Sequence, residues 1–361
     1  MHYFYICTRI EKKIVLKELD IEIIKSFREL ISKPNQKVLI LPHVNPDGDA
    51  VGSALGLSRV LKNSGILVEV ISVNDYPEFY YWMAGHEQVT FYSKKPKKIR
   101  QLFQESDLLI CLDFNHMSRT GDLKSLVENY AKPRVLIDHH PYPQDFPDVL
   151  ISHPECSSTA ELVYHVLRAM DFEKYLDREA AEALFCGIMT DTGSFDYNVS
   201  DPQTFQTVGE LLKFGIDQDY IHAKVFDNYS ADRMRLLGYC LNECMEVFPE
   251  YHAAVMYLSK ETQKKFNFVP GDSEGFVNYP LSIKGIHFST LFTERDDMVK
   301  ASFRSKGEFP ANEFASENFN GGGHRNAAGG EVYGSLTETL DRYRKLLPAY
   351  QELLVKTKSK G

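Results

Sequence analysis

One stretch decides the fold of this chain: Lys37-Val-Leu-Ile-Leu-Pro-His43-Val-Asn-Pro-Asp47-Gly-Asp49-Ala-Val-Gly52. It begins with an apolar run, which is typical of a buried strand in a parallel sheet. A polar turn follows, and the chain then enters a segment with the pattern of a helix. His43, Asp47 and Asp49 stand where the strand ends, and open α/β sheets bind their ligands at the carboxyl ends of strands. The stretch therefore predicts one wall of a ligand site.

An apolar run that ends on an acid recurs along the chain. Residues 108–113 and 134–138 have this form, and the second run continues into two histidines. A further acid stands in a Thr-Asp-Thr-Gly turn after a helical segment. One aspartate after a strand is usually a helix cap or a turn former, but the recurrence indicates a shared site. The residues concerned are His43, Asp47, Asp49, Asp113, Asp138, His139, His140 and Asp191.

The chemistry of these side chains predicts a pair of divalent metal ions. Carboxylate and imidazole ligands without a thiolate favour Mn²⁺, Mg²⁺, Co²⁺ or Fe²⁺ over a structural zinc ion. Asp47, Asp49, Asp113 and Asp191 bring about four negative charges, which would balance two such cations. Two metals about 4 Å apart can activate water and stabilise the attacking and leaving oxygens at phosphorus. Asp138 could instead lie outside the ligand set and orient a neighbouring histidine.

A second constellation lies at Asn320-Gly-Gly-Gly-His324-Arg325-Asn326-Ala-Ala-Gly-Gly330. It is not a dinucleotide fingerprint, because Asn326 stands where the last glycine would be. A glycine-rich loop of this kind can present backbone N–H groups to an anion, and cationic side chains strengthen the binding. The candidate phosphate-binding residues are Arg119, Arg304, Gly322, Gly323, His324 and Arg325.

Composition limits the class of protein. The chain has 361 residues, of which 43% are hydrophobic and 25% charged, and its net charge is −9. A protein that tracks along nucleic acid usually has a basic surface, so we expect a short substrate and no long nucleic acid. No apolar stretch has the length of a membrane span and the N-terminus lacks a secretory pattern, so we expect a cytoplasmic protein without a membrane partner.

The order of the expected elements predicts two domains. Strands alternate with helices through about residue 228, which indicates an α/β domain with a mostly parallel sheet flanked by helices. Residues 1–15 form an extension of unknown role, and 229–242 are expected to be a helical linker. Residues 243–361 are expected to form a smaller α+β domain across a cleft, with a substrate-binding role.

The motifs resemble those of the DHH phosphoesterase superfamily. Asp138-His139-His140 matches the triplet that names it, and residues 43–53, Asp113 and 187–193 match its other motifs. Residues 321–329 are similar to the hallmark of the DHH-associated C-terminal domain. The resemblance covers about residues 37 to 335. Length and layout are most similar to the bifunctional oligoribonuclease and PAP phosphatase group.

The resemblance implies a role for each matching residue. One metal would take His43, Asp47 and Asp113, and the other would take Asp49, Asp113, His139 and Asp191. The catalytic residues would be His140, Asp113 and Asp138, with His140 facing the scissile phosphate or the leaving group. Ser157 and Ser158 would lie near the substrate, and Arg304, His324 and Arg325 would hold its distal phosphate or nucleotide.

The resemblance also implies the activity. It points to a Mn²⁺-dependent hydrolase of short oligoribonucleotides and of 3'-phosphoadenosine 5'-phosphate (PAP), with Mg²⁺ or Co²⁺ as alternative metals. A pApA or cyclic-di-AMP phosphodiesterase, an exopolyphosphatase-like enzyme and a non-catalytic phosphoanion-binding regulator are the alternatives. The glycine-rich segment counts against a pyrophosphatase. A RecJ-like exonuclease would have a basic channel, which the net charge of −9 does not favour. A homodimer is left open.

Overall fold

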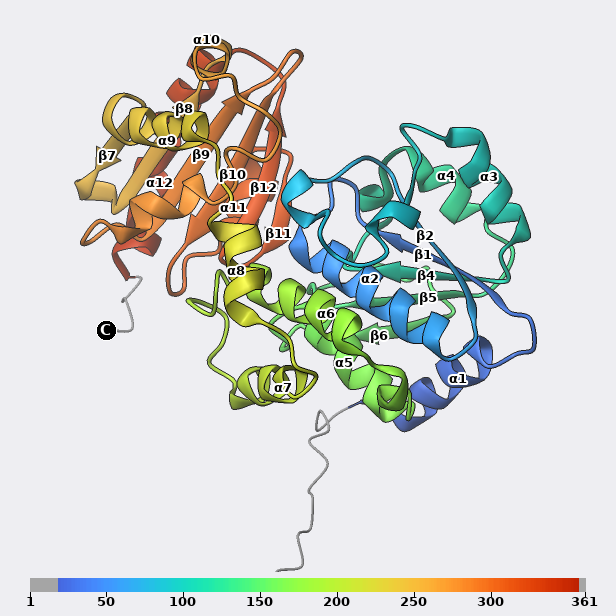
Figure 1. The fold of residues 1–361 in the computed structure, drawn as a ribbon. Helices are drawn as coiled ribbons and strands as arrows, with labels where there is room; N and C mark the ends of the chain where they lie inside the picture. The colour runs from blue at the N-terminus through green and yellow to red at the C-terminus, as the bar shows by residue number, and fades with distance from the viewer. Residues whose placement is uncertain (1–18, 357–361) are drawn as a thin grey trace, which may run out of the picture. The chain divides into compact units, whose positions relative to one another are not determined.

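The computed structural model describes residues 19–356, which divide into two compact units with the boundary after Asp227 (Figure 1). The extension expected at residues 1–15 lies outside this range. Each unit is built around its own sheet.

The sheet of the first unit has six strands in the order β3-β2-β1-β4-β5-β6. Its strands are β1 (Lys37–Pro42), β2 (Leu67–Ser72), β3 (Thr90–Phe91), β4 (Leu108–Leu112), β5 (Arg134–Asp138) and β6 (Val149–Ser152). All of the pairings are parallel, and Val38 of β1 lies opposite Leu108 of β4. The order reverses between β1 and β4, which makes the carboxyl ends of these two strands the expected ligand site.

Helices cover both faces of this sheet. They are α1 (Ile21–Ile31), α2 (Gly48–Asn63), α3 (Pro96–Glu105), α4 (Lys124–Glu128), α5 (Thr159–Ala169), α6 (Arg178–Asp191), α7 (Pro202–Leu212) and α8 (Gln218–Phe226). Alternate residues of a strand point to opposite faces, so Val38 and Ile40 join the core under α2, α5 and α6. Leu39 and Leu41 join the core on the other face, under α3 and α4. The expected α/β architecture is confirmed.

The second unit is a mixed sheet with the strand order β11-β12-β10-β9-β8-β7. Its strands are β7 (Met245–Phe248), β8 (Ala253–Leu258), β9 (Phe288–Glu294), β10 (Val299–Ser305), β11 (Gly322–His324) and β12 (Ala327–Val332). Its helices are α9 (Ala231–Glu243), α10 (Lys260–Lys265), α11 (Ala311–Asn318) and α12 (Leu336–Lys356). Only β8 and β9 pair in parallel among these strands, so the expected α+β unit is confirmed.

The helix α9 occupies most of the segment expected as a linker. Its Leu236 and Cys240 are buried with Met256 of β8 and Leu291 of β9. The helix therefore belongs to the core of the second unit.

The glycine-rich segment differs from the loop we expected. Residues 322–324 form strand β11, which pairs antiparallel with β12, so that the segment is a hairpin at the edge of the sheet. A Cβ atom at Gly321 would collide with the carbonyl oxygen of Gly329, and one at Gly323 with that of Ala327. These two glycines are therefore required by the close approach of the strands.

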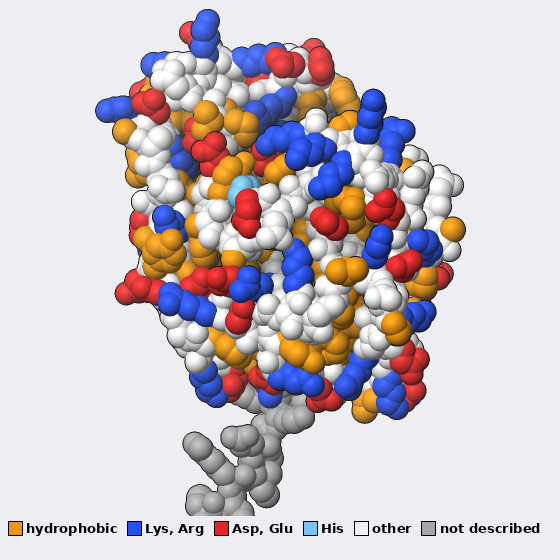
Figure 2. All heavy atoms as spheres, turned by 45° about the vertical axis from the view of Figure 1, so that its right-hand side comes forward, with side chains coloured by type: hydrophobic (Ala, Val, Ile, Leu, Met, Phe, Trp, Pro, Cys, Tyr) orange, Lys and Arg blue, Asp and Glu red, His pale blue; other side chains and the backbone are white. Residues whose placement is uncertain are grey.

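The surface carries charges of both signs. Basic and acidic side chains are interspersed over the face drawn in Figure 2. Among residues 19–356, no helix is both long enough and apolar enough to cross a bilayer.

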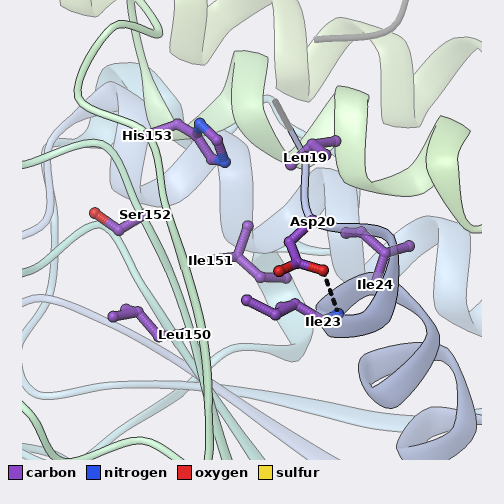
Figure 3. Close-up of a pocket in the computed structure, with 8 residues that line it drawn as sticks. All are labelled: Leu19, Asp20, Ile23, Ile24, Leu150, Ile151, Ser152 and His153. Atoms are coloured by element: carbon purple, nitrogen blue, oxygen red, sulfur yellow. Dashed lines mark hydrogen bonds between the residues drawn. The ribbon is translucent and has the colours of Figure 1, made fainter. Parts of the chain in front are cut away.

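A cavity of about 160 Å³ lies between α1 and β6 (Figure 3). It is lined by Leu19, Asp20, Ile23, Ile24, Leu150, Ile151, Ser152 and His153. The carboxylate of Asp20 accepts hydrogen bonds from the first turn of α1, so it acts as the cap of that helix. None of the predicted site residues lines this cavity.

Candidate metal centre

The predicted ligands of the first unit come from five elements that meet at the carboxyl edge of its sheet. His43 follows β1, Asp113 follows β4, and β5 ends at Asp138, directly before His139 and His140. Two further aspartates belong to α2: Asp47 is its N-cap and Asp49 lies in its first turn. Asp191 is the last residue of α6.

Glycines allow α2 and α6 to pack closely enough to bring their aspartates together. A Cβ atom on Gly52 of α2 would collide with the carbonyl oxygen of Ala183 and approach the amide nitrogen of Gly187. A Cβ atom on Gly187 of α6 would lie 3.0 Å from the Asp49 carboxylate. The backbones of the two helices are therefore in contact near the site, which places Asp49 beside the end of α6.

The first ligand group consists of His43, Asp47 and Asp113. The His43 Nε2 atom lies 3.7 Å from Asp47 Oδ2 and 3.4 Å from Asp113 Oδ2. Its Nδ1 atom lies 2.8 Å from the carbonyl oxygen of Val44, which can only accept, so Nδ1 carries the proton and Nε2 faces the carboxylates. A hydrogen bond of this kind fixes the tautomer of metal-binding histidines.

The second group consists of Asp49, His139 and Asp191. The His139 Nε2 atom lies 3.8 Å from Asp49 Oδ2, 3.7 Å from Asp113 Oδ1 and 3.4 Å from Asp191 Oδ2. Its Nδ1 atom lies 3.2 Å from the carbonyl oxygen of Cys156. In each of these two groups the ligand atoms lie within 4.8 Å of one another.

Asp113 stands between the two groups. Its Oδ2 atom faces His43 and its Oδ1 atom faces His139. Its φ of 64° lies in the left-handed region, which is unfavourable for a residue with a Cβ atom. Strain of this kind persists only where the surroundings impose it and is concentrated at functional sites.

The electrostatics favour a bound cation. Burial, together with the charges of Asp113 and Asp191, raises the pKa of Asp49 well above its usual range. Burial and Arg119 lower the pKa of His43, but its hydrogen bonds to Asp113 and Asp47 outweigh them and raise it to about 9. The buried carboxylates thus repel one another and attract positive charge to the space between them.

The N-terminus of α5 supports this cluster, and the sequence reasoning missed its role. The backbone N–H groups of Thr159 and Ala160 donate to the Asp49 carboxylate, at 2.6 and 2.8 Å. The Thr159 hydroxyl donates to Asp113 Oδ1 at 2.8 Å. Ser158-Thr-Ala-Glu161 has the pattern of a capping box, which marks a helix start. The preference of a helix N-terminus for carboxylates was the available signal.

A buried carboxylate holds the turn before α5. One oxygen of Glu161 accepts the backbone N–H of Ser157 at 2.9 Å, the Ser157 hydroxyl at 2.6 Å and the Thr204 hydroxyl at 3.1 Å. Ser158 caps α5 through the N–H of Glu161. Both predicted substrate-binding serines are therefore buried, and their hydroxyl groups make hydrogen bonds within the protein.

His140 and Arg119 complete the predicted residues of this unit. The His140 Nδ1 atom lies 2.7 Å from Asp138 Oδ1 and 3.7 Å from Asp113 Oδ1. The Asp138 side chain is fully buried, and its hydrogen bond with Nδ1 orients the His140 imidazole. Arg119 is exposed, and its carbonyl oxygen accepts the N–H of Val44, which ties it to the loop after His43.

The remaining predicted residues lie in the second unit. Ala327 of β12 pairs with Arg304 of β10 on one side and with His324 of β11 on the other. Directly paired residues lie on the same face of a sheet, so these two side chains share one face. Arg325 lies in the hairpin turn and forms an ion pair with Glu308 at 2.6 Å. Gly322 and Gly323 are part of β11.

Comparison with known proteins identifies the family. Residues 37–188 match the model described as "DHH family, N-terminal domain", and residues 250–354 match the "DHHA1 domain". A probable bifunctional oligoribonuclease and PAP phosphatase NrnA of Streptococcus mutans is 30% identical and covers 89% of this chain and 98% of its own length. The chain belongs to the DHH family. The predicted resemblance and the expected phosphoesterase class are thereby confirmed.

Another relative and two solved structures are similar to this chain over more than half of their own length. The bifunctional oligoribonuclease and PAP phosphatase NrnA of Bacillus subtilis is 26% identical over 82% of this chain and 89% of its own. A crystal structure of an exopolyphosphatase-related protein from Bacteroides fragilis is 42% identical, with a TM-score of 0.90 over 95% of this chain and 100% of its own. RecJ of Thermus thermophilus, solved with Mn²⁺, shares the fold at 15% identity, with a TM-score of 0.53 over 92% of this chain and 54% of its own.

The residues present fit a divalent metal centre. The histidines are held by backbone carbonyls with Nε2 turned inward, and repulsion from Asp113 and Asp191 helps to raise the pKa of the buried Asp49 carboxyl, which a bound cation would relieve. Nitrogen and oxygen donors of this kind suit Mn²⁺, Mg²⁺ or Co²⁺.

Proposed function

We propose that this protein is a metal-dependent phosphohydrolase that cleaves short oligoribonucleotides and PAP, with two Mn²⁺ ions as its cofactor. The position of Asp113 carries the proposal. Its two carboxylate oxygens face two separate groups of ligands, 3.4 Å from His43 on one side and 3.7 Å from His139 on the other. A carboxylate shared between two sites is characteristic of centres that hold a metal pair.

Each ion would have its own ligands. His43, Asp47 and Asp113 would hold one, and Asp49, Asp113, His139 and Asp191 would hold the other. When bound, such a pair activates water and stabilises the charge that develops on the phosphoryl oxygens. The hydrogen bonds from α5 would keep the Asp49 and Asp113 carboxylates in place before the ions arrive.

The other residues of the site would handle the substrate. Asp138 orients the His140 ring, and an imidazole held in this way can donate a proton to the leaving-group oxygen. The exposed guanidinium of Arg119, next to the His43 loop, would bind a phosphate. In the second unit, Arg304 and His324 share one sheet face, which supports a role in holding the distal phosphate or nucleotide.

The substrate class is supported by the relatives and by charge. Several relatives bear the name bifunctional oligoribonuclease and PAP phosphatase. A long nucleic acid usually binds to a basic surface, whereas this chain has a net charge of −9 and the face drawn in Figure 2 carries charges of both signs. A cytoplasmic location stays a prediction, and a homodimer stays an open alternative.

A substrate panel tests the proposal. Purified protein with Mn²⁺ is expected to release mononucleotide from a dinucleotide and phosphate from PAP. Asp113→Asn should lose more than about 100-fold of this activity, because both ligand groups lose a charged oxygen. Asp219→Asn, an exposed residue of α8, is the matched control. Turnover of neither substrate by the wild-type protein would contradict the proposal.

The same panel of substrates tests a second candidate function, the hydrolysis of inorganic polyphosphate. The similar Bacteroides fragilis structure is described as exopolyphosphatase-related, which favours inorganic polyphosphate as an alternative substrate. Polyphosphate, pyrophosphate, pApA and cyclic-di-AMP therefore complete the panel. Faster turnover of polyphosphate than of any nucleotide would replace the proposed function with the second candidate. Binding of all of these compounds without turnover would indicate a regulator.

A further inference from the structure

An unusually exposed aromatic side chain follows His139 and His140 in the chain. Tyr142 is 87% exposed, which is the largest value among the large hydrophobic side chains of the described residues. Its φ of 58° lies in the left-handed region. A bulky residue rarely adopts this conformation, because its Cβ atom approaches the following carbonyl oxygen. Neither burial nor backbone preference therefore explains a tyrosine at this position.

Hydrogen bonds to the loop after β4 impose this conformation. The Asn115 side chain donates to the carbonyl oxygen of Pro141 at 2.7 Å, and the backbone carbonyl oxygen of Asn115 accepts the N–H of Gln144 at 2.7 Å. The Gln144 side chain in turn accepts the N–H of Met117 at 3.0 Å. The residues on both sides of Tyr142 are thus fixed, and the ring is held out in solvent.

Tyr142 and Asn115, whose loops are joined by these hydrogen bonds, both lie close in sequence to residues of the metal centre. Tyr142 is two residues after His140, and Asn115 is two residues after Asp113. Two residues span at most about 7 Å between Cα atoms. The Tyr142 Cα atom therefore lies within about 7 Å of that of His140, the residue proposed to face the scissile phosphate, and at 87% exposure its ring is open to a ligand.

We propose that Tyr142 is a stacking platform for a nucleobase of the substrate. The proposal rests on the proposed phosphoester cleavage at this centre and narrows its substrates to nucleotides. Every nucleobase has a flat face that stacks on aromatic side chains, without requiring a particular sequence. An inorganic polyphosphate has no base, so the ring would not increase its binding affinity.

Binding of two ligands that differ only in the base tests the platform. AMP and ribose 5-phosphate are titrated into the full-length protein loaded with Mn²⁺, with heat or fluorescence as the signal. Wild-type protein should bind AMP about tenfold more tightly than ribose 5-phosphate, within the range known for stacking on one aromatic ring. Tyr142→Ala should lose this preference and bind ribose 5-phosphate as wild type does, whereas Tyr142→Phe should keep it.

Tyr333→Ala is the matched control. This tyrosine is 73% exposed, and it follows the end of β12 that lies away from Arg304. Its removal should leave both affinities unchanged. An AMP preference that survives in Tyr142→Ala, or is absent in wild type, would overturn the proposal. Because the titration needs no turnover, a protein that prefers AMP but cleaves no nucleotide would refute the proposed function and leave the platform standing.

Discussion

The hydroxyl of Thr159 donates a hydrogen bond of 2.8 Å to the Asp113 carboxylate, across 46 positions of sequence. The backbone N–H of the same residue donates to Asp49 at 2.6 Å. Thr159 therefore holds one aspartate of each ligand group, and the first turn of α5 is a scaffold for the metal centre. Mutation of a residue that hydrogen-bonds to a metal ligand commonly lowers metal affinity or activity by about 10–100-fold.

Thr159→Val should weaken the centre, whereas Thr159→Ser should preserve it. Valine has nearly the same shape but lacks the donor, so one buried oxygen of Asp113 loses its hydrogen bond. We expect Mn²⁺ affinity and kcat/KM to fall by about tenfold in the valine variant. Calorimetric titration with Mn²⁺ and steady-state kinetics measure the two quantities. Equal loss in both variants would mean that the hydroxyl has no such role.

Gly52→Ala should destabilise the first unit and separate the ligands. Its methyl group would collide with the α6 backbone, which cannot move without repacking. We expect a loss of about 1–3 kcal/mol in the free energy of unfolding, measured in urea. Mn²⁺ should also stabilise this variant less than wild type, because Asp49 moves away from Asp191. Gly209→Ala, at a helical glycine with no neighbour within 4 Å, should not be destabilised.

The ionisation of Glu161 makes the stability of the first unit depend on pH. Burial raises its pKa, but the hydrogen bonds from His165 and Ser157 outweigh it, so the folded-state pKa is lowered. A carboxyl group whose pKa is lower in the folded state stabilises the protein at pH values above its unfolded-state pKa. This stabilisation is lost as the pH falls through the folded-state pKa.

Glu161→Gln should accordingly cost about 1–3 kcal/mol at pH 7, where an amide replaces a charged acceptor of several donors. The difference between wild type and variant should shrink as the pH is lowered below about 4. Urea unfolding at several pH values measures both effects. The exposed Glu29→Gln on α1 serves as the reference, and a difference that grows in acid would contradict the assignment.

Tyr142→Asn should stabilise the protein. Asparagine tolerates the left-handed region better than tyrosine does, and the strain at φ 58° amounts to about 1 kcal/mol. An increase in Tm of about 2–4 °C is expected for a unit of this size. Tyr142→Ala keeps the strain and should show no such increase. A decrease in Tm for the asparagine variant would show that the ring itself stabilises the loop.

Strand ends were predictable from sequence because the apolar runs are short and end on polar residues. The runs before His43, Asp113 and Asp138 became β1, β4 and β5. The short strands β3 and β6 were missed, since so few residues carry no clear period. The glycine-rich segment was expected to be a loop, because the close approach that makes it a hairpin involves residues that are not adjacent in sequence.

The sequence by itself determined the ligand types, the order of the motifs and the family, because these depend on residue identity and spacing alone. Only the tertiary structure decided which ligands face each other. The parallel pairing of β1 with β4 brings His43 to one oxygen of Asp113. The contact of α2 with α6 brings Asp49 and Asp191 together beside His139. The reason is physical: strand register and helix contact depend on the packing of distant residues, which no local pattern encodes.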